Sequence, residues 1–420
     1  MYDIIVVGSG PSSCFMTYYL LKYTDYNICL ITKCFVKFHC TYGIFEKHIK
    51  NSWFIEKDNF RDCFVDFKKE MKCDISCSNK KLDLANTIEI KDEIYLLLDN
   101  DKCFLKLSHF FKEKQLNIIE EAVLKIEKTY QGKKVYYKNT FLESKMVIEG
   151  TGNYTPIGIK YLNEIPYNYQ TFFGLKIKTK RPHNFKNVIL MDWYDTQVES
   201  SKPPSFCYFI PYSKNILFCE ETILVHPKVT KTELNEYYNI LEKRLEKRLE
   251  KYNIEIDEIL FKEINSISMT RYIPDPDSLS FGIGINGNIF SPISGYSVGL
   301  NIYNIPYIID LIKNNNFNTR DIYKGYWNFF RKIIFLINYS GHNLILSLKT
   351  NKENSIFFKN FISKTNINKE HFDVLFHNIF EKKLKFLFTI YIYFFLNKMI
   401  TKRLLYNSFI IFGNNYNLLF

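Results

Sequence analysis

Tyr2-Asp-Ile-Ile-Val-Val-Gly8-Ser-Gly10-Pro-Ser-Ser13 opens the chain, and this stretch decides the class of fold. The apolar run before Gly8 is typical of a strand that is buried on both faces of a parallel sheet. A helical stretch to about Tyr23 follows, and Asn27–Ile31 has the composition of a second strand. A Gly-x-Gly-x-x-Ser turn between a strand and a helix predicts a βαβ unit that binds a dinucleotide.

The small residues of this turn have separate predicted roles. Gly8 permits the tight turn, Gly10 lets the backbone approach a pyrophosphate, and Ser13 allows close helix–strand packing. We expect the pyrophosphate at the N-terminus of the helix that starts near Pro11. The acidic residue that usually holds the ribose after the second strand is absent, and Thr32 offers a single hydrogen bond in its place.

Two later glycine-rich turns are predicted to contact the same nucleotide, although ordinary turns are the alternative. The first follows a strand at Met146–Glu149, and the second lies between a strand pattern at Ser280–Gly287 and a helix that ends at about Lys313. A second helix N-terminus with small residues suits a phosphate or the edge of a flavin ring. The residues predicted to contact the cofactor here are Gly150, Gly152, Gly287, Ser291 and Gly295.

The middle of the chain changes to patterns typical of antiparallel strands, at residues 171–178, 188–193, 205–211 and 216–225. A helix is expected at Thr230–Tyr252, with a leucine stripe facing the core and Glu-Lys-Arg repeats forming a solvated face. The sequence therefore predicts an α/β protein with a doubly wound, Rossmann-type lobe and an antiparallel substrate lobe. The expected parts are residues 1–165 and 266–313 for the nucleotide lobe, 166–265 for the substrate lobe, and 314–420 for a helical region.

Two adjacent glutamates, Glu220 and Glu221, lie inside the last of these strand patterns. Successive side chains of a strand point to opposite faces, so one glutamate can enter a buried cavity. Burial makes a carboxyl costly to ionise and raises its pKa, as a general acid near neutral pH requires. Phe218 and Ile216 share the parity of Glu220, which weakly favours Glu220 as the acid. A surface ladder or an ion pair with a lysine is the alternative.

Composition limits the partners. The chain of 420 residues is 46% hydrophobic and carries a net charge of +12, which suits nucleic acid or an anionic lipid surface. No nucleic-acid motif is present, so we expect membrane contact and no nucleic acid. Among ten cysteines only Cys73 and Cys77 are closely spaced, and no partner pair completes a zinc set. We therefore expect no metal site and reduced thiols.

No apolar run reaches the roughly 18 residues of a membrane-spanning helix. Phe386–Leu396, flanked by lysines, is either a buried helix or a helix that lies in the membrane interface. The first predicted strand starts at Tyr2, so we expect no signal or transit peptide. The predicted location is the cytoplasmic side of a membrane, with peripheral association.

Several motifs occur in the order found in one enzyme family. Phe218-Cys-Glu-Glu-Thr222 and Met191-Asp-Trp-Tyr-Asp195 are similar to Phe-Leu-Glu-Glu-Thr and Met-Asp-Trp-Arg-Asp, a quite specific pair. Less specific matches are Gly8–Pro11, Tyr42-Gly43, Glu149–Gly152, Tyr169-Gln170 with Gly174, and Ser291–Tyr296. The chain therefore resembles the lycopene β- and ε-cyclases of plants and cyanobacteria, a family that includes capsanthin-capsorubin synthase.

The resemblance implies an FAD-dependent, acid-catalysed cyclisation of lycopene ends to β- or ε-rings, without net redox change. It implies reduced FAD, with NADPH as the source of electrons, and a helical tail at the membrane. Glu220 or Glu221 would supply the proton. Asp192 and Trp193 would stabilise the carbocation, together with the anionic flavin.

Some positions depart from the family. Its histidine in His-Pro-x-x-Gly-Tyr is Ser291 here, and serine cannot act as an imidazole base. His226 is either a substitute or a structural residue. Two other functions stay open: a hydroxylase or reductase of an isoprenoid lipid, and a catalytically impaired flavin- or lipid-binding homologue. Redox relatives normally carry Gly-Asp before the late helix, and Asn286-Gly-Asn288 lacks that aspartate, which favours the cyclase. The sequence leaves the ring type and the oligomeric state open.

Overall fold

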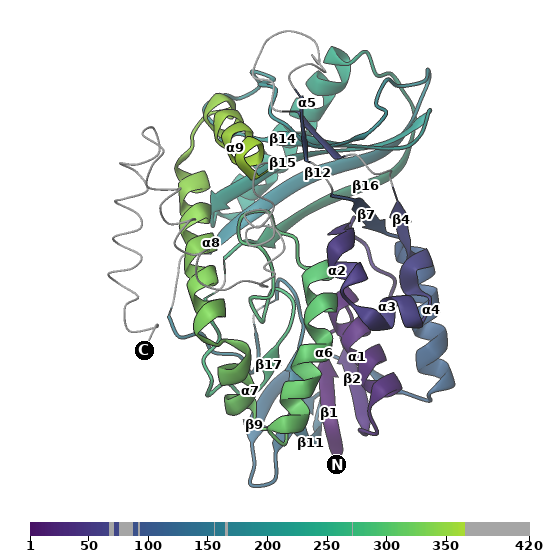
Figure 1. The fold of residues 1–420 in the computed structure, drawn as a ribbon, viewed down its shortest axis with the longest axis vertical. Helices are drawn as coiled ribbons and strands as arrows, with labels where there is room; N and C mark the ends of the chain where they lie inside the picture. Colours follow the sequence, from purple (N-terminus) through teal and green to yellow (C-terminus); the bar gives the residue numbers. More distant parts are fainter. Residues whose placement is uncertain are drawn as a thin grey trace.

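The computed structural model describes residues 1–66, 71–74, 87–90, 93–154, 156–163, 167–270 and 272–365. Two large β-sheets form two lobes, one above the other in Figure 1, with helices α1, α6 and α4 beside the lower sheet and α5 over the upper one. Helices α8 (Phe329–Ser347) and α9 (Asn351–Thr365) run along one side of the molecule toward the upper lobe. This arrangement confirms the predicted α/β class with two lobes and C-terminal helices.

The lower sheet is built on parallel strands in the order β8-β2-β1-β11. Ile4 to Val7 of β1 are buried, since strands lie on both sides and helices cover the sheet. The antiparallel hairpin β9–β10 extends the sheet, and β17 joins β11 in parallel. The strands of this sheet are β1 (Tyr2–Val7), β2 (Ile28–Thr32), β8 (Asn117–Glu120), β9 (Val123–Lys128), β10 (Lys133–Tyr137), β11 (Thr140–Glu149) and β17 (Phe281–Gly282).

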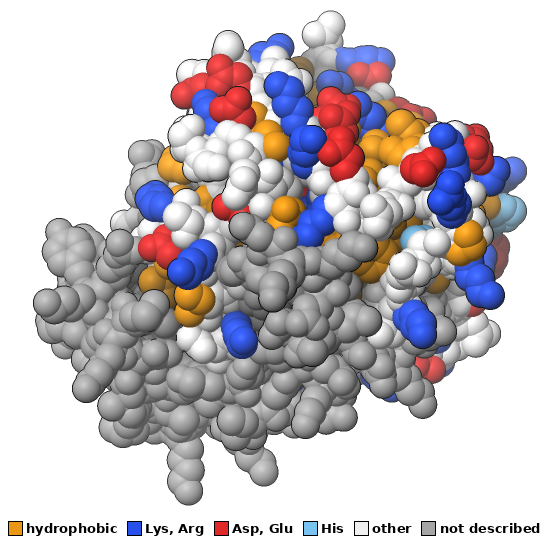
Figure 2. Space-filling model, turned by 90° about the horizontal axis from the view of Figure 1, so that it is seen from above, with side chains coloured by type: hydrophobic (Ala, Val, Ile, Leu, Met, Phe, Trp, Pro, Cys, Tyr) orange, Lys and Arg blue, Asp and Glu red, His pale blue; other side chains and the backbone are white. Residues whose placement is uncertain are grey.

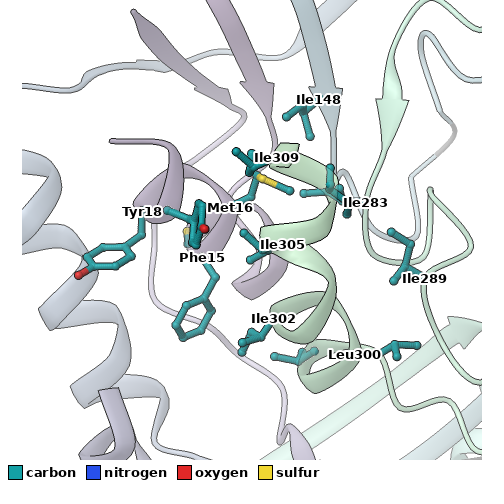
Figure 3. Packing of buried hydrophobic residues seen from close by; sticks show 14 of the residues in the cluster. Phe15, Met16, Tyr18, Ile148, Ile283, Ile289, Leu300, Ile302, Ile305 and Ile309 are labelled. Carbon is teal, nitrogen blue, oxygen red and sulfur yellow. The ribbon is translucent and has the colours of Figure 1, made fainter. Parts of the chain in front are cut away.

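Helices α1 (Pro11–Tyr23) and α6 (Val298–Asn314) pack side by side on this sheet. Figure 3 shows Phe15 and Met16 of α1 close to Ile302, Ile305 and Ile309 of α6. All five side chains are almost fully buried. The apolar contact between the two helices fixes the start of α6 relative to the Gly-x-Gly turn, because both helices begin at the same end of the sheet.

The upper sheet has the order β16-β12-β15-β14-β13-β5-β6 and is antiparallel except for the β13–β5 pair. It contains the four predicted strands, and it also takes β5 and β6 from residues 71–90 and β16 from residues 256–268. The strands are β5 (Met71–Asp74), β6 (Thr87–Ile90), β12 (Asn168–Thr179), β13 (Val188–Asp192), β14 (Phe206–Ser213), β15 (Ile216–Pro227) and β16 (Ile256–Ser268).

Helix α5 (Lys231–Lys251) covers the outer face of the upper sheet. It starts with a capping box, in which Thr230 and Glu233 satisfy each other's backbone N–H groups. Leu241, Leu245 and Leu249 pack on the sheet, as the leucine stripe predicts. The expectation that the Glu-Lys-Arg repeats are solvated is wrong for Arg244 and Arg248, which are buried.

A small sheet and short helices lie where the two lobes meet. The strand order of the small sheet is β3 (Gly43–Phe45), β7 (Tyr95–Leu98) and β4 (Phe64–Asp66). The other described helices are α2 (Glu46–Lys50), α3 (Trp53–Lys57), the 3₁₀ helix η1 (Phe60–Cys63), α4 (Asn100–Glu113) and α7 (Thr319–Tyr326). The small sheet places residues 40–43 and Tyr95 beside the upper sheet, where they border the cavity described below.

The surface and the helices bear on the expected membrane contact. Basic and acidic side chains are interspersed on the face that Figure 2 shows, with hydrophobic side chains between them. Within the described ranges, no helix is both long and apolar enough to cross a membrane. The Phe386–Leu396 segment and the side chains of Cys73 and Cys77 lie outside what the structure describes.

Candidate active site

A cavity of about 280 Å³ lies between the two lobes. The upper sheet contributes residues of β12, β14, β15 and β16 to its wall. The lower lobe contributes Thr41–Gly43, the Gly152-Asn153 turn and the segment from Ser294 to Val298, where α6 begins. Six aromatic side chains line it: Tyr42, Tyr95, Phe172, Tyr208, Phe218 and Tyr296. The cavity is therefore rich in aromatic side chains and borders the lobe that is predicted to bind the cofactor.

Glu220 is the member of the glutamate pair that lines this cavity. It is buried, and its Oε1 atom accepts a hydrogen bond of 2.9 Å from the Thr222 hydroxyl. Burial, together with the nearby carboxyl of Glu263, raises the pKa of Glu220 well above its ordinary value. A carboxyl with a raised pKa keeps its proton to higher pH than an exposed one, so Glu220 is suited to act as an acid.

Glu263 of β16 is the residue that the sequence analysis missed. It is buried, and its Oε2 atom accepts a hydrogen bond of 2.9 Å from the backbone N–H of Thr41. Burial raises its pKa as well. Glu263 shares its strand parity with Asn265 and Ile267, which line the cavity. That parity was the available signal, but it is useful only once residues 256–268 are recognised as a strand.

Glu221 and Asp192 lie on the opposite face of the upper sheet from the cavity, beneath α5. Arg248 binds Glu221 through Nε and Nη2, at 2.8 and 2.9 Å, and its Nη1 atom lies 2.8 Å from Asp192 Oδ2. Tyr252 and Ser205 donate further hydrogen bonds to the two carboxylates. All three charged side chains are fully buried. The structure thus assigns Glu221 and Asp192 to a buried ion cluster that holds α5 to the sheet.

Trp193 also lies away from the cavity. Its ring is 1% exposed and stacks on Phe358 of α9, with 5.5 Å between ring centroids. It also contacts Phe206 at 4.9 Å. The predicted cation-stabilising position of Trp193 and Asp192 is therefore not what the structure shows. The aromatic residues that line the cavity come from other segments.

The ion cluster leads to a stability prediction. Arg248→Met leaves two buried carboxylates without their cation, and breaking a buried pair in this way costs about 3–5 kcal/mol. We expect urea unfolding to show this loss. The matched control is Arg320→Met, because Arg320 pairs with Asp277 on the surface at 3.4 Å and exposed pairs contribute at most about 1 kcal/mol. Equal losses in the two variants would contradict the assignment.

The Gly-x-Gly turn has the geometry of a pyrophosphate site. Gly8 adopts φ +103°, and a Cβ there would lie 2.5 Å from the carbonyl oxygen of Gly150. Gly10 caps α1, and a Cβ on Gly10 would project into open space, with no atom within 4 Å. No side chain caps α1, and its first turn has no acidic residue. Backbone N–H groups are thus available to an anion at this helix N-terminus.

Ser13, Gly150, Gly152 and Thr32 are the other residues predicted to contact the nucleotide near this turn. Ser13 lies against Gly150, with its hydroxyl donating to the Gly150 carbonyl at 3.3 Å, so both serve the close packing of helix and strand. Gly152 adopts φ +67° and borders the cavity, with open space where a Cβ would stand. The Thr32 hydroxyl lies 2.8 Å from that of Ser9 and donates to the Cys34 carbonyl at 3.1 Å.

The late glycine turns are only partly at the cavity. Gly295, at φ +81°, lines it beside Gln170. Ser291 is fully buried, and its carbonyl accepts a hydrogen bond of 2.8 Å from the Gly295 N–H, so it shapes the turn. Gly287 packs directly on the Gly282 backbone and does not line the cavity.

His226 does not replace the missing histidine in this cavity. Its Nε2 lies 2.7 Å from the Thr171 hydroxyl, and its Nδ1 lies 2.7 Å from the Pro227 carbonyl oxygen. Burial lowers its pKa to about 4, so the ring is neutral at physiological pH. A neutral ring that donates from Nδ1 to the carbonyl accepts at Nε2 from Thr171. These contacts give His226 a structural role.

Comparison with known proteins finds a family model and curated relatives that agree with one another. Residues 3–366 match the model of a family described as lycopene cyclase protein. Capsanthin/capsorubin synthase of Capsicum annuum is 24% identical over 342 residues, which cover 78% of this chain and 64% of that protein. Lycopene beta cyclase of Arabidopsis thaliana is 26% identical over 223 residues, 50% of this chain and 41% of that protein. The chain thus spans less than two thirds of the length of these curated relatives.

Solved structures share the fold at low identity. A geranylgeranyl bacteriochlorophyll reductase-like protein of Thermoplasma acidophilum aligns with a TM-score of 0.67 and 14% identity, covering 97% of this chain and 99% of that one. A flavin-dependent brominase aligns with a TM-score of 0.59 and 15% identity, covering 89% and 93%. At these identities the likeness shows a common fold.

Proposed function

Since this chain belongs to the lycopene cyclase family, we propose that it is a flavoprotein that cyclises the ends of a carotenoid polyene by acid catalysis. The observation that carries the proposal is Glu220, a buried carboxyl that lines an aromatic cavity between the lobes, where burial raises its pKa. Lycopene, or a polyene with the same acyclic end, is the substrate that this chemistry suits.

The first step is proton transfer from the Glu220 carboxyl to the end double bond of the polyene. The tertiary carbocation that results is attacked by the neighbouring alkene, which closes the ring. Loss of a ring proton then restores a neutral product, and the Glu220 carboxylate is the base at hand. The ring carbon from which this proton leaves decides between a β- and an ε-ring.

The rings around the cavity stabilise the cation. Tyr42, Tyr95, Tyr208 and Tyr296 come from four different segments, and Phe172 and Phe218 complete the wall. A cation close to the faces of such rings gains about 0.5–2 kcal/mol per favourable contact. A polyene that fills this aromatic-lined cavity would also exclude water, which would otherwise trap the cation as an alcohol.

The chain's fit to FAD supports the flavin part of the proposal. The N-terminus of α1 with Gly8 and Gly10 would hold the pyrophosphate, and Gly152 and Gly295 leave the cavity open toward the start of α6. Bound in its reduced, anionic form, the flavin would add negative charge beside the cation. NADPH as its reductant stays a prediction from the family resemblance.

Expression in bacteria that accumulate lycopene, followed by chromatography of the pigments, tests this function. A β- or ε-ring product supports the proposal. An oxygenated or saturated product would instead identify a hydroxylase or reductase of an isoprenoid. Unchanged lycopene in cells that contain folded, flavin-loaded protein would identify a binding homologue and sink the proposal.

We also propose peripheral membrane association, because the substrate class is insoluble in water and the chain is basic. If the apolar Phe386–Leu396 segment inserts, membranes washed in high salt retain part of the protein, since salt screens only electrostatic contacts. The double variant Ile390→Asp/Phe394→Asp should release the protein from the membranes, whereas Lys385→Ala should change little. Full recovery of the wild-type protein in the soluble fraction at low salt, without detergent, would count against insertion.

A further inference from the structure

Two buried glutamates face each other across one glycine of the upper sheet. Strand β12 lies between β15 and β16, and Gly174 of β12 pairs with Glu220 on one side and with Glu263 on the other. Residues directly opposite one another in an antiparallel sheet project to the same face. Glu220 and Glu263 therefore lie on the cavity face, with no side chain between them.

Gly174 is needed for its lack of a side chain. A Cβ at this position would lie 3.0 Å from Cγ of Glu263 and 3.1 Å from Cζ of Phe218. A side chain here would press on Glu263 and Phe218, and these neighbours would have to shift by a few tenths of an ångström. The sheet thus leaves a gap one residue wide between the two carboxyl groups.

The hydrogen bonds that the two carboxyl groups accept leave one buried oxygen without a donor. Thr222 donates to Glu220, and the Thr41 N–H donates to one oxygen of Glu263. The other oxygen, Oε1 of Glu263, is buried and has no donor among the described residues when both groups are ionised. Two carboxylates are acceptors only, so a bond between them needs one proton.

No basic side chain lines the cavity in the described part of the chain. Lys176 lies on the same face of β12 as Gly174, two residues further along the strand, and its Nζ atom lies over the Tyr212 ring, 3.9 Å from the ring centroid. Besides Lys176, the titratable groups that face the pair are a thiol and phenols, from the segment before β3, from β7 and β14, and from the turn before α6. They are Cys40, Tyr42, Tyr95, Tyr208, Tyr212 and Tyr296. Two carboxyl groups this close cannot both ionise readily, because their negative charges repel each other, and this favours a pair that keeps one proton.

We propose that Glu220 and Glu263 hold one proton between them, and that Glu263 is the positioning residue that keeps it on Glu220 for delivery to the polyene. This inference rests on the proposed function. In the transfer, the O–H bond of the pair breaks and its electron pair stays on oxygen, while the alkene electron pair forms the new C–H bond. The proton lost from the ring returns to the pair, so no oxidant or reductant is consumed.

Two measurements on the purified holoprotein test the pair. Infrared titration, with isotope-labelled glutamate, follows the protonated carboxyl directly and needs no turnover. The pH profile of cyclisation follows the same proton in catalysis. In Glu263→Gln the like charge is gone, so the pKa of Glu220 falls. Both the infrared midpoint and the alkaline limb of the rate should move to lower pH by about one unit or more.

Two further variants accompany Glu263→Gln: one perturbs the pair in a second way, and the other is a control. Gly174→Ala presses a methyl group against Cγ of Glu263 and should move the midpoint in the same direction by a smaller amount. Glu258→Gln changes an exposed glutamate on the same strand and should move neither curve. A merely structural role of Glu263 would lower stability and leave the pH midpoints unchanged.

The possible results separate this inference from the proposed function. Two ionised carboxylates at neutral pH in the wild-type infrared spectrum would overturn the inference even if cyclisation occurs. The same holds if Glu263→Gln is folded and its midpoint equals that of the wild type. A shared proton in a protein that leaves lycopene unchanged would uphold the pair and refute the cyclase.

Discussion

Glu220→Gln is expected to lower the rate of cyclisation by about 10²–10⁴-fold, the usual effect of removing a general acid. Glutamine keeps the shape of the side chain and can still contact Thr222 and Glu263, but its amide cannot deliver a proton to an alkene. Flavin content and circular dichroism should remain those of the wild type. The measurement is the initial rate of ring formation from lycopene in liposomes, with reduced flavin.

Glu221→Gln is the matched control for this result. It alters the neighbouring carboxyl, which faces Arg248 on the other side of the sheet. We expect a lower Tm, because Arg248 loses part of its charge compensation, but an unchanged rate per folded molecule. If Glu220→Gln cyclises lycopene at the wild-type rate, the acid lies elsewhere.

Gly10→Val is expected to abolish flavin binding while leaving the fold in place. A Cβ at Gly10 meets no protein atom within 4 Å, so the free protein tolerates it. The added side chain would instead occupy the space at the N-terminus of α1 in which we place the pyrophosphate. The purified variant should lack the yellow colour and the flavin absorbance of the wild type.

The control for Gly10→Val is the thermal stability of both proteins after removal of the flavin, which should agree closely. Gly8→Val is a contrasting variant, because its Cβ would press on the Gly150 carbonyl and should destabilise the protein itself. A wild-type protein that is colourless and takes up no added FAD would refute the flavin site.

The sequence predicted those features that depend on local pattern. The Gly-x-Gly opening, the strand at 216–225 and the leucine stripe of α5 were all visible in short windows. The period of two along a strand also placed Glu220 and Glu221 on opposite faces correctly. What it could not decide was which face is the cavity, because both sides of this strand are nearly equally apolar.

Tertiary contacts explain what the sequence analysis missed. Arg248 belongs to a charged repeat that looks solvated, and only the fold brings Asp192 and Glu221 to it from two strands. Strand β16 lies at the edge of the sheet and has register shifts opposite β12, which interrupt the alternation that reveals a strand. Glu263 was hidden for that reason.

The most direct test of the central claim is mass spectrometry of the product formed from lycopene by the purified protein with reduced FAD, in H₂O and in D₂O. Acid-catalysed cyclisation predicts a product with the same mass as lycopene in H₂O. In D₂O it predicts one deuterium gained for each ring closed, since one deuteron adds and one proton leaves. A product that carries an added oxygen, or two more hydrogens than lycopene, would show redox chemistry and contradict the account.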